Sequence, residues 1–143
     1  MIIASLNDLD IPCCDIGNAY INTDCREKLW TVTGAEFGSK KGIIMIMAKA
    51  LYGLKSSGAA WRAKLAETMK TMGYKSTQAD TDVWIKRDVK SNRQDYYCYM
   101  LVYVDDDVLY VHHNPEIDMK LLSFYWLKDG VGSPSRYLGA NIE

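Results

Sequence analysis

The sequence predicts one α+β domain, with an antiparallel sheet and two helices packed on one face of it. Two observations lead to this prediction: short apolar runs bounded by turn residues recur along the chain, and two longer segments have helical character. With 143 residues, of which 48% are hydrophobic, the chain is long enough to bury one core, and its composition is typical of a globular protein.

Apolar runs that end at turn-forming residues are expected to be strands. In chain order they cover residues 11–15, 42–54, 81–89, 95–104, 108–113 and 136–142. The polar stretch KSNRQ predicts a hairpin between the third and fourth runs. The connection after residue 104 is so short that the fourth and fifth runs must also form a tight hairpin.

Two segments are expected to be helices. The first covers residues 56–74, with Ser56 or Ser57 as its N-cap and Gly73 as its C-cap. Four apolar side chains share one face of this helix: Trp61, Leu65, Met69 and Met72. The second covers residues 115–128, where a proline opens the helix and acidic residues occupy its first turn.

Charge is distributed unevenly along the chain, although the net charge is only −1. Residues 40–75 contain eight basic residues and one acid, so this segment carries +7 and the remainder −8. A basic middle between acidic clusters suits a nucleic-acid-binding protein with a metal site. The alternative is a solvated helix face, and charge alone leaves both interpretations open.

The four cysteines, at positions 13, 14, 25 and 98, lack the C-x-x-C spacing of common zinc sites. Their pattern favours a reduced intracellular protein over a disulfide framework. The first ten residues lack the basic region of a signal peptide, and no membrane span is expected.

Three adjacent carboxylates interrupt the apolar run LVYVDDDVLYV at residues 101–111. Asp105 and Asp106 are expected at the hairpin tip, where their mutual repulsion calls for a divalent cation, and hard oxygen ligands favour Mg²⁺ or Mn²⁺. Asp15 ends another strand, which could be a neighbour in the same sheet, and is the best third carboxylate. The alternative is a surface hairpin that carries acids without a metal.

Three motifs closely resemble the palm of copia-type retrotransposon reverse transcriptases. They are DIGNAY at 15–20, ALYGLKSSGAAW at 50–61 and YVDD at 103–106. The family's usual segments are Asp-Val-x-x-Ala-Phe, ALYGLKQSPRAW and YVDD. Weaker similarity lies in REKLW, GAEFG, TDVW and YLGANIE, so the resemblance covers nearly the whole chain. It implies a polymerase palm-like fold and RNA-directed DNA synthesis.

The resemblance also implies roles for the carboxylates. Asp15 and Asp105 would hold two divalent ions, Mg²⁺ or Mn²⁺, about 3.5–4 Å apart. Asp106 would be a supporting carboxylate near the primer end, and the backbone carbonyl of Ile16 an extra ligand. The substrates would be deoxynucleoside triphosphates and an RNA or DNA template with its primer.

Five further residues match positions where the family contacts its substrates. Tyr20 would exclude the 2′-hydroxyl of a ribonucleotide by steric clash; the alternative is that Tyr20 only packs in the core. Tyr52 and Gly53 would lie against the nucleotide and the template base. Lys55 would contact a template phosphate, unless it is simply an exposed lysine. Tyr103 would pack beside the metals or touch the primer backbone.

The sequence departs from the family pattern at Ser56 and Gly58, which replace Gln and Pro, and at Asp107, which replaces an apolar residue. Residues 1–143 are expected to be a partial domain, with fingers, thumb and RNase H largely missing and the rest of the polyprotein as a partner. The implied location is intracellular: cytoplasmic virus-like particles, and also the nucleus. Two alternatives stay open, an inactive palm-fold remnant of a degenerate element and another palm-type enzyme such as a nucleotide cyclase.

Overall fold

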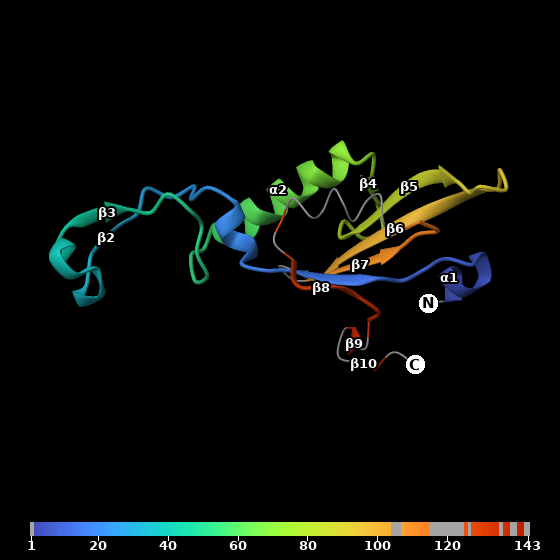
Figure 1. Cartoon of the computed structure of the whole chain (residues 1–143). Helices are drawn as coiled ribbons and strands as arrows, with labels where there is room; N and C mark the ends of the chain where they lie inside the picture. Colours follow the sequence, from blue (N-terminus) through green and yellow to red (C-terminus); the bar gives the residue numbers. More distant parts are fainter. Residues whose placement is uncertain are drawn as a thin grey trace.

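The computed structural model describes residues 2–103, 107–114, 125, 127–134, 136–137 and 140–141. Its centre is a six-stranded sheet with the order β4-β5-β6-β7-β1-β8, and all its strand pairs are antiparallel (Figure 1). The strands are β1 (Cys13–Ile16), β4 (Lys75–Ser76), β5 (Val83–Val89), β6 (Asp95–Tyr103), β7 (Asp107–Val111) and β8 (Leu127–Gly132). The α+β class with an antiparallel sheet is confirmed.

Strand β1 lies inside the sheet, between β7 and β8. Cys13 lies opposite Leu109 on one side and opposite Gly132 on the other. Cys14 and Ile16 alternate with half-buried neighbours and point into the core, as period-2 strand geometry requires. The sequence correctly predicted both the end of this strand near Asp15 and a turn at Gly17 and Asn18, where Asn18 has a positive φ of 54°.

The two predicted hairpins of the sheet are present. Strand β5 pairs with β6 from Val83–Leu101 to Val89–Asp95, and residues 90–94 form the turn between them. Strand β6 pairs with β7 as far as Tyr103 and Asp107. Residues 104–106 lie outside the described residues, so the expected position of the tip stays a prediction.

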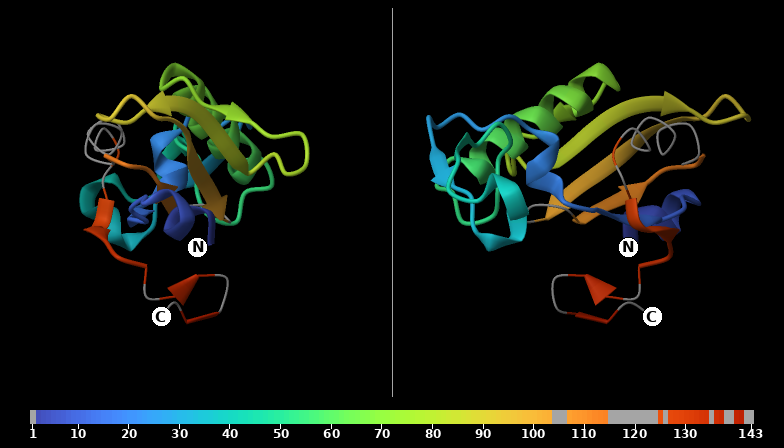
Figure 2. Two further views of the ribbon diagram at one scale, coloured as in Figure 1. Left: turned by 90° about the vertical axis from the view of Figure 1, so that its right-hand side faces the viewer. Right: turned by 60° about the vertical axis from the view of Figure 1, so that its left-hand side comes forward.

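Helix α2 (Ser57–Thr71) lies across one face of the sheet (Figures 1 and 2). Ser56 is its N-cap residue, as predicted. After its last turn, Gly73 adopts a φ of 86°, its N–H bonds to the Lys70 carbonyl and that of Tyr74 bonds to the Met69 carbonyl. These two bonds are the Schellman motif, which requires the left-handed backbone that glycine adopts readily.

The apolar face of α2 forms the core with the sheet. All four side chains predicted to share this face are buried: Trp61, Leu65, Met69 and Met72. They pack with strand residues such as Trp84, Met100 and Tyr110 in one hydrophobic cluster. This burial, rather than helix propensity, holds α2 in place.

A second, two-stranded sheet projects from the body (Figures 1 and 2). It pairs β2 (Trp30–Val32) with β3 (Ile44–Ile46), and the 3₁₀ helix η2 (Ala35–Lys40) lies in the connection. The prediction of one strand over residues 42–54 was wrong in extent, because only Ile44–Ile46 is extended in a ladder. Gly53, with a φ of 92°, and the turn around it end the apolar run in a loop.

The ends of the chain differ most from expectation. Helix α1 (Ile2–Asn7) was not predicted, and strand β8 takes the last two residues of the expected second helix. Of that helix, only Tyr125 is otherwise described, and its ring packs edge-on against Trp61 of α2, with centroids 5.4 Å apart. Strands β9 (Arg136–Tyr137) and β10 (Ala140–Asn141) pair antiparallel with each other, so the prediction of one strand over residues 136–142 was wrong.

Among the described residues, no helix is long and apolar enough to span a bilayer. The two-helix layer remains a prediction, because residues 115–124 lie outside the described part.

Candidate active site at the end of the central strands

Strands β1, β6 and β7 bring the acidic motifs to one end of the sheet. Asp15 lies opposite Asp107, and Asp107 lies opposite Tyr103. Asp107 directly follows Asp105 and Asp106, which are themselves outside the described residues. The prediction that the Asp15 strand neighbours the hairpin of the aspartates is therefore confirmed at the level of strand pairing.

Asp15 is held on a rigid support. Its strand has a partner on each side, and the flanking side chains of Cys14 and Ile16 are buried in the core. The side chain of Asp15 is half-buried, and its Oδ1 atom is shielded from solvent. A carboxylate in this position loses little conformational freedom when it binds a cation, because the strand has already fixed its backbone.

Two tyrosines of the expected nucleotide pocket meet. Tyr20 lies in the 3₁₀ helix η1 (Ala19–Asn22), directly after the turn that follows β1, and is 8% exposed. Tyr52 lies just before Gly53 and is 57% exposed. Their ring centroids are 4.3 Å apart. The structure thus brings together residues from two of the recognised motifs, while the core alternative for Tyr20 agrees with its low exposure.

Glu27 binds the N-cap residue of α2, and the sequence analysis did not predict this contact. Its Oε1 accepts a hydrogen bond from the Ser56 N–H at 3.0 Å and a second from the Ser56 hydroxyl. These bonds, together with the nearby positive charge of Lys55, lower the pKa of Glu27. Ser56, which stands where the family pattern has Gln, could have pointed to this contact. Free N–H and hydroxyl donors at the start of a helix favour a negatively charged acceptor nearby. Lys55 itself is exposed, as a phosphate contact requires.

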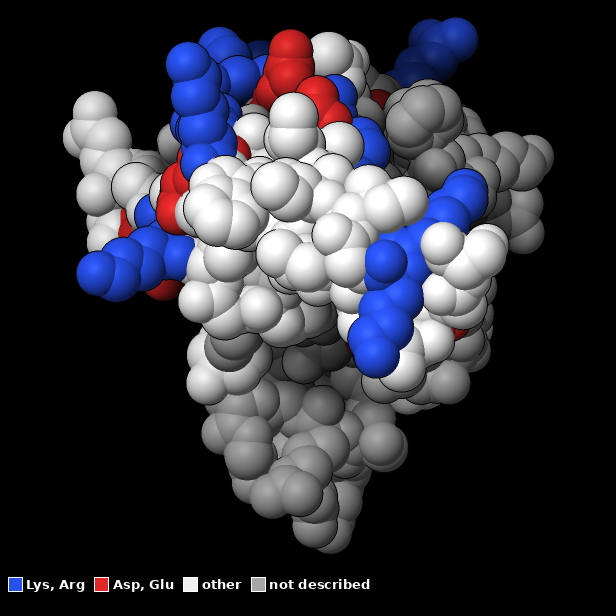
Figure 3. Space-filling view, turned by 90° about the vertical axis from the view of Figure 1, so that its left-hand side faces the viewer, with Lys and Arg blue, Asp and Glu red and all other residues white. Residues whose placement is uncertain are grey.

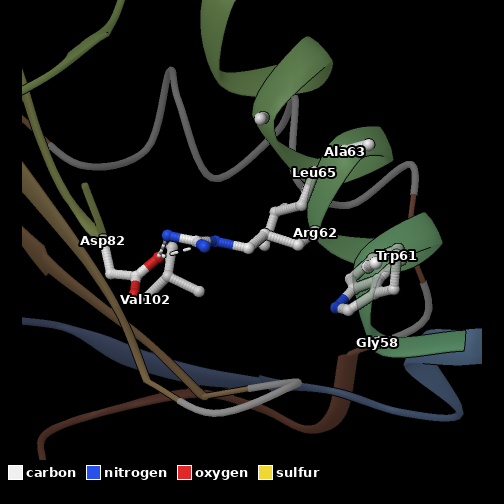
Figure 4. A pocket seen from close by; sticks show the side chains of 9 residues that line it. Gly58, Trp61, Arg62, Ala63, Leu65, Asp82 and Val102 are labelled. Atoms are coloured by element: carbon white, nitrogen blue, oxygen red, sulfur yellow. Dashed lines mark hydrogen bonds and ion pairs between the residues drawn. The ribbon is translucent and has the colours of Figure 1, made fainter. Parts of the chain in front are cut away.

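A groove of about 650 Å³ lies between α2 and the ends of β5 and β6 (Figure 4). Arg62 reaches across it from α2 to Asp82, with Nη2 2.7 Å from Oδ1, and also donates to the Thr81 hydroxyl. Val102, one residue before Tyr103, lines the groove on the sheet side. The groove therefore opens at the same end of the sheet as Asp15, and its lining includes Gly58 and Trp61 of the ALYGLKSSGAAW motif and Asp82 of TDVW, although the sequence did not predict a groove.

The basic segment is partly neutralised by acids elsewhere in the fold. Lys49 pairs with Asp24 and Arg62 with Asp82, both at 2.7 Å, although neither acid belongs to the segment. Figure 3 views the end with β2 and β3, where Lys and Arg side chains lie around a broad uncharged face. Exposed apolar side chains contribute to this end of the molecule: Trp30, Val32, Phe37, Ile43, Ile44 and Ile46.

Comparison with known proteins identifies the family. A family model described as reverse transcriptase (RNA-dependent DNA polymerase) matches residues 1–143. The chain belongs to the reverse transcriptase family. It is 31% identical over 106 residues to a retrovirus-related Pol polyprotein from transposon TNT 1-94 of Nicotiana tabacum, and 30% identical over 105 residues to that from transposon RE1 of Arabidopsis thaliana. These matches cover 73% and 72% of the chain.

The family predicted from the three motifs is thus confirmed. A third relative, the Pol polyprotein from transposon RE2 of Arabidopsis thaliana, is 29% identical over 94 residues, or 64% of the chain. The chain spans less than a tenth of each relative, with matched shares of 8%, 7% and 6%. No solved structure matches the chain. The individual roles of the site residues stay predictions.

Proposed function

We propose that this chain is the palm region of a copia-type retrotransposon reverse transcriptase and that it supports RNA-directed DNA synthesis. The main supporting observation is the register of Asp15 with Asp107, which sets the first acidic motif beside the strand that follows the YVDD segment. Membership of the reverse transcriptase family throughout the chain adds to this support. The arrangement of sheet and helix is compatible with a polymerase palm.

The available donors fit a divalent cation of the Mg²⁺ type. Asp15 offers a carboxylate on a strand paired at both edges, and the Ile16 carbonyl follows it in the same strand. Carboxylate and carbonyl oxygens are the hard ligands that Mg²⁺ and Mn²⁺ prefer. Asp105 and Asp106 would complete the set. When bound, two such ions would lower the pKa of the primer 3′-hydroxyl and neutralise charge on the triphosphate.

The other residues position the substrates. Tyr20, held by the ring of Tyr52, would limit the space beside the nucleotide sugar. Gly53 would allow close approach of the backbone to the base pair. Lys55, exposed beside the start of α2, would contact the template backbone, and Tyr103, 43% exposed, would lie against the primer end. Most of the rate acceleration would come from this positioning and from charge neutralisation.

The chain would work as part of a Pol polyprotein in virus-like particles, since its relatives are far longer. The second candidate is the inactive remnant of a degenerate element. The exposed apolar surface around β2 and β3 supports the first candidate instead, because large exposed apolar patches mark surfaces that pack against other parts of a protein.

Calorimetry with Mg²⁺, with and without a deoxynucleoside triphosphate, separates the two candidates. Wild type is compared with Asp15→Asn and Asp105→Asn, and Asp24→Asn is the matched control because Asp24 is an exposed acid paired with Lys49. We expect nucleotide to strengthen Mg²⁺ binding in wild type and Asp24→Asn only, and primer extension to follow the same pattern. Equal, weak Mg²⁺ binding in all four proteins would mean that the carboxylates do not form a metal site in this chain, and it would refute the polymerase proposal.

A further inference from the structure

A second cluster of metal-ligating side chains lies on β5, β6 and β7, away from the candidate active site. It consists of Asp88, Cys98 and His112, whose ligand atoms all lie within 4.8 Å of one another. Cys98 is five residues before Tyr103 on β6, so the cluster is about 17 Å along the strand from that end. The reverse transcriptase site described above uses none of these residues.

The sheet register explains why three residues far apart in sequence converge. Cys98 lies opposite Lys86 on β5, and Asp88, two residues further on, projects from the same face. Tyr99 lies opposite Val111 on β7, and continuing this register sets Cys98 opposite His112. The His112 backbone is also fixed by two hydrogen bonds with Asp10, of 2.9 and 3.1 Å. The cluster is thus built on a rigid scaffold.

The distances match those around a tetrahedral zinc ion. His112 Nε2 is 3.4 Å from Asp88 Oδ2, and Cys98 Sγ is 3.8 Å from the same oxygen. Zinc bonds of about 2.0–2.3 Å at tetrahedral angles require nitrogen–oxygen and sulfur–oxygen separations of about 3.4 and 3.6 Å. We propose that Asp88, Cys98 and His112 form a Zn²⁺ site, separate from the site that would bind Mg²⁺.

The ligand chemistry favours zinc over magnesium. A thiolate and an imidazole are softer ligands than the oxygen donors that Mg²⁺ prefers. Binding replaces the thiol proton of Cys98, which is released to solvent as the zinc–sulfur bond forms. Cys98 and His112 are 0% and 3% exposed, whereas the Asp88 side chain is 41% exposed. Solvent therefore reaches the cluster from the Asp88 side, where a water molecule completes the four ligands.

Zinc binding requires a change in the protonation of His112. Its Nδ1 accepts the Asn114 N–H at 2.7 Å, so in the neutral ring the proton sits on Nε2. For Nε2 to coordinate zinc, the ring proton must move from Nε2 to Nδ1. A protonated Nδ1 can no longer accept the Asn114 N–H, so the hydrogen bond between them must break. The Tyr96 hydroxyl oxygen, 3.4 Å from Nδ1, can then accept a hydrogen bond from the protonated Nδ1. Tyr96 is therefore a positioning residue for the site.

The test uses the full 143-residue chain stripped of metal with a chelator. Zn²⁺ affinity is measured by competition with a chromophoric chelator, and Co²⁺ is added to record its absorption spectrum. We expect one tightly bound ion per chain and a thiolate-to-cobalt charge-transfer band. Cys98→Ser and Asp88→Asn should each weaken Zn²⁺ binding at least about tenfold, and Tyr96→Phe about tenfold, because it keeps every ligand but removes the acceptor for Nδ1–H.

Two control variants separate this site from others. Cys25→Ser removes a thiol outside the sheet, and Asp15→Asn removes the acid of the candidate active site; both should bind Zn²⁺ as wild type does. A wild-type Co²⁺ spectrum without the thiolate band overturns the proposal, as does equal affinity in Cys98→Ser and Cys25→Ser. Since Cys98 is fully buried and its substitution can prevent folding, the wild-type spectrum and the half-exposed Asp88→Asn decide the question independently.

Discussion

The rings of Tyr20 and Tyr52 lie with their centroids 4.3 Å apart and their planes tilted by 47°. One belongs to the segment that follows β1 and the other to the loop before α2, so this contact ties two separate motifs together. Tyr20 is nearly buried while Tyr52 remains mostly exposed. A ligand that enters beside Tyr20 therefore meets a ring whose position Tyr52 helps to set.

This contact predicts how the chain discriminates between sugars, if the proposed function holds. Tyr20→Ala should raise ribonucleotide affinity relative to deoxynucleotide affinity on the order of tenfold, because it removes the group that clashes with the 2′-hydroxyl. Tyr52→Ala should shift the ratio in the same direction but less, and Tyr52→Phe should not. Competitive binding of the two nucleotides measures the ratio. Tyr97→Ala, an exposed tyrosine of β6, is the control, and an unchanged ratio in Tyr20→Ala would exclude Tyr20 from this role.

Glu27 should make the stability of the chain sensitive to acid. Hydrogen bonds from Ser56 lower the pKa of Glu27 below its ordinary value of 4.5, so the folded state binds this proton less readily than the unfolded chain. The resulting stabilisation is present above pH 4.5 and is lost as the pH falls through the lowered pKa. Wild type should therefore lose melting temperature faster below pH 5 than Glu27→Gln does. Parallel pH profiles for the two proteins would contradict this, and Glu36→Gln is the control.

Burial of the α2 face predicts a large cost for its truncation. Met69 is 0% exposed and packs in the main cluster, so Met69→Ala should reduce the free energy of unfolding by about 2–5 kcal/mol. Lys70→Ala, one position along on the exposed side, should change it by less than about 0.5 kcal/mol. Denaturant titration measures both. Similar effects in the two variants would mean that α2 does not pack on the sheet as described.

Gly53 should tolerate substitution poorly for a backbone reason. Its φ is 92°, but a Cβ added there would meet no atom within 4 Å. Gly53→Ala should therefore cost about 1–2 kcal/mol through conformational strain alone. Gly132→Ala is the matched control, because a Cβ there also meets nothing and the residue lies in extended strand β8. Denaturant unfolding compares the two, and an equal effect would show that Gly53 does not need this backbone conformation.

Local signals predicted those parts of the fold whose partners are close in sequence. The β5–β6 hairpin follows from two apolar runs around KSNRQ, and α2 follows from its apolar spacing and from Gly73. The position of β3 could not be predicted in the same way. An apolar run such as Ile44–Ile46 resembles a strand of the main sheet, and only the equally apolar Trp30–Val32 beside it shows that the two form a separate pair.

Of the candidate active site, the adjacency of the Asp15 strand and the aspartate hairpin was predictable, because both acidic motifs lie at the ends of apolar runs. Asp15 and Tyr20 share one such motif, and the strand order then set Asp15 beside β7. Glu27 and the cluster around Cys98 were not predictable from spacing. Each depends on a partner that only the tertiary structure brings near, whether 29 positions away, as Ser56 is from Glu27, or on another strand.

The insertion of β1 between β7 and β8 has a consequence for the order of folding. Strand β1 is synthesised before every other strand of the six-stranded sheet, yet its partners are the last two of those strands in the sequence. Strands β5, β6 and β7 can pair after closing only short loops. Pairing β1 with β7 requires closure of a loop from Asp15 to Asp107, which costs more conformational entropy. In a nascent chain the first acidic motif therefore stays without its sheet partner until β7 (Asp107–Val111) has left the ribosome, so the pairing that sets Asp15 opposite Asp107 forms late.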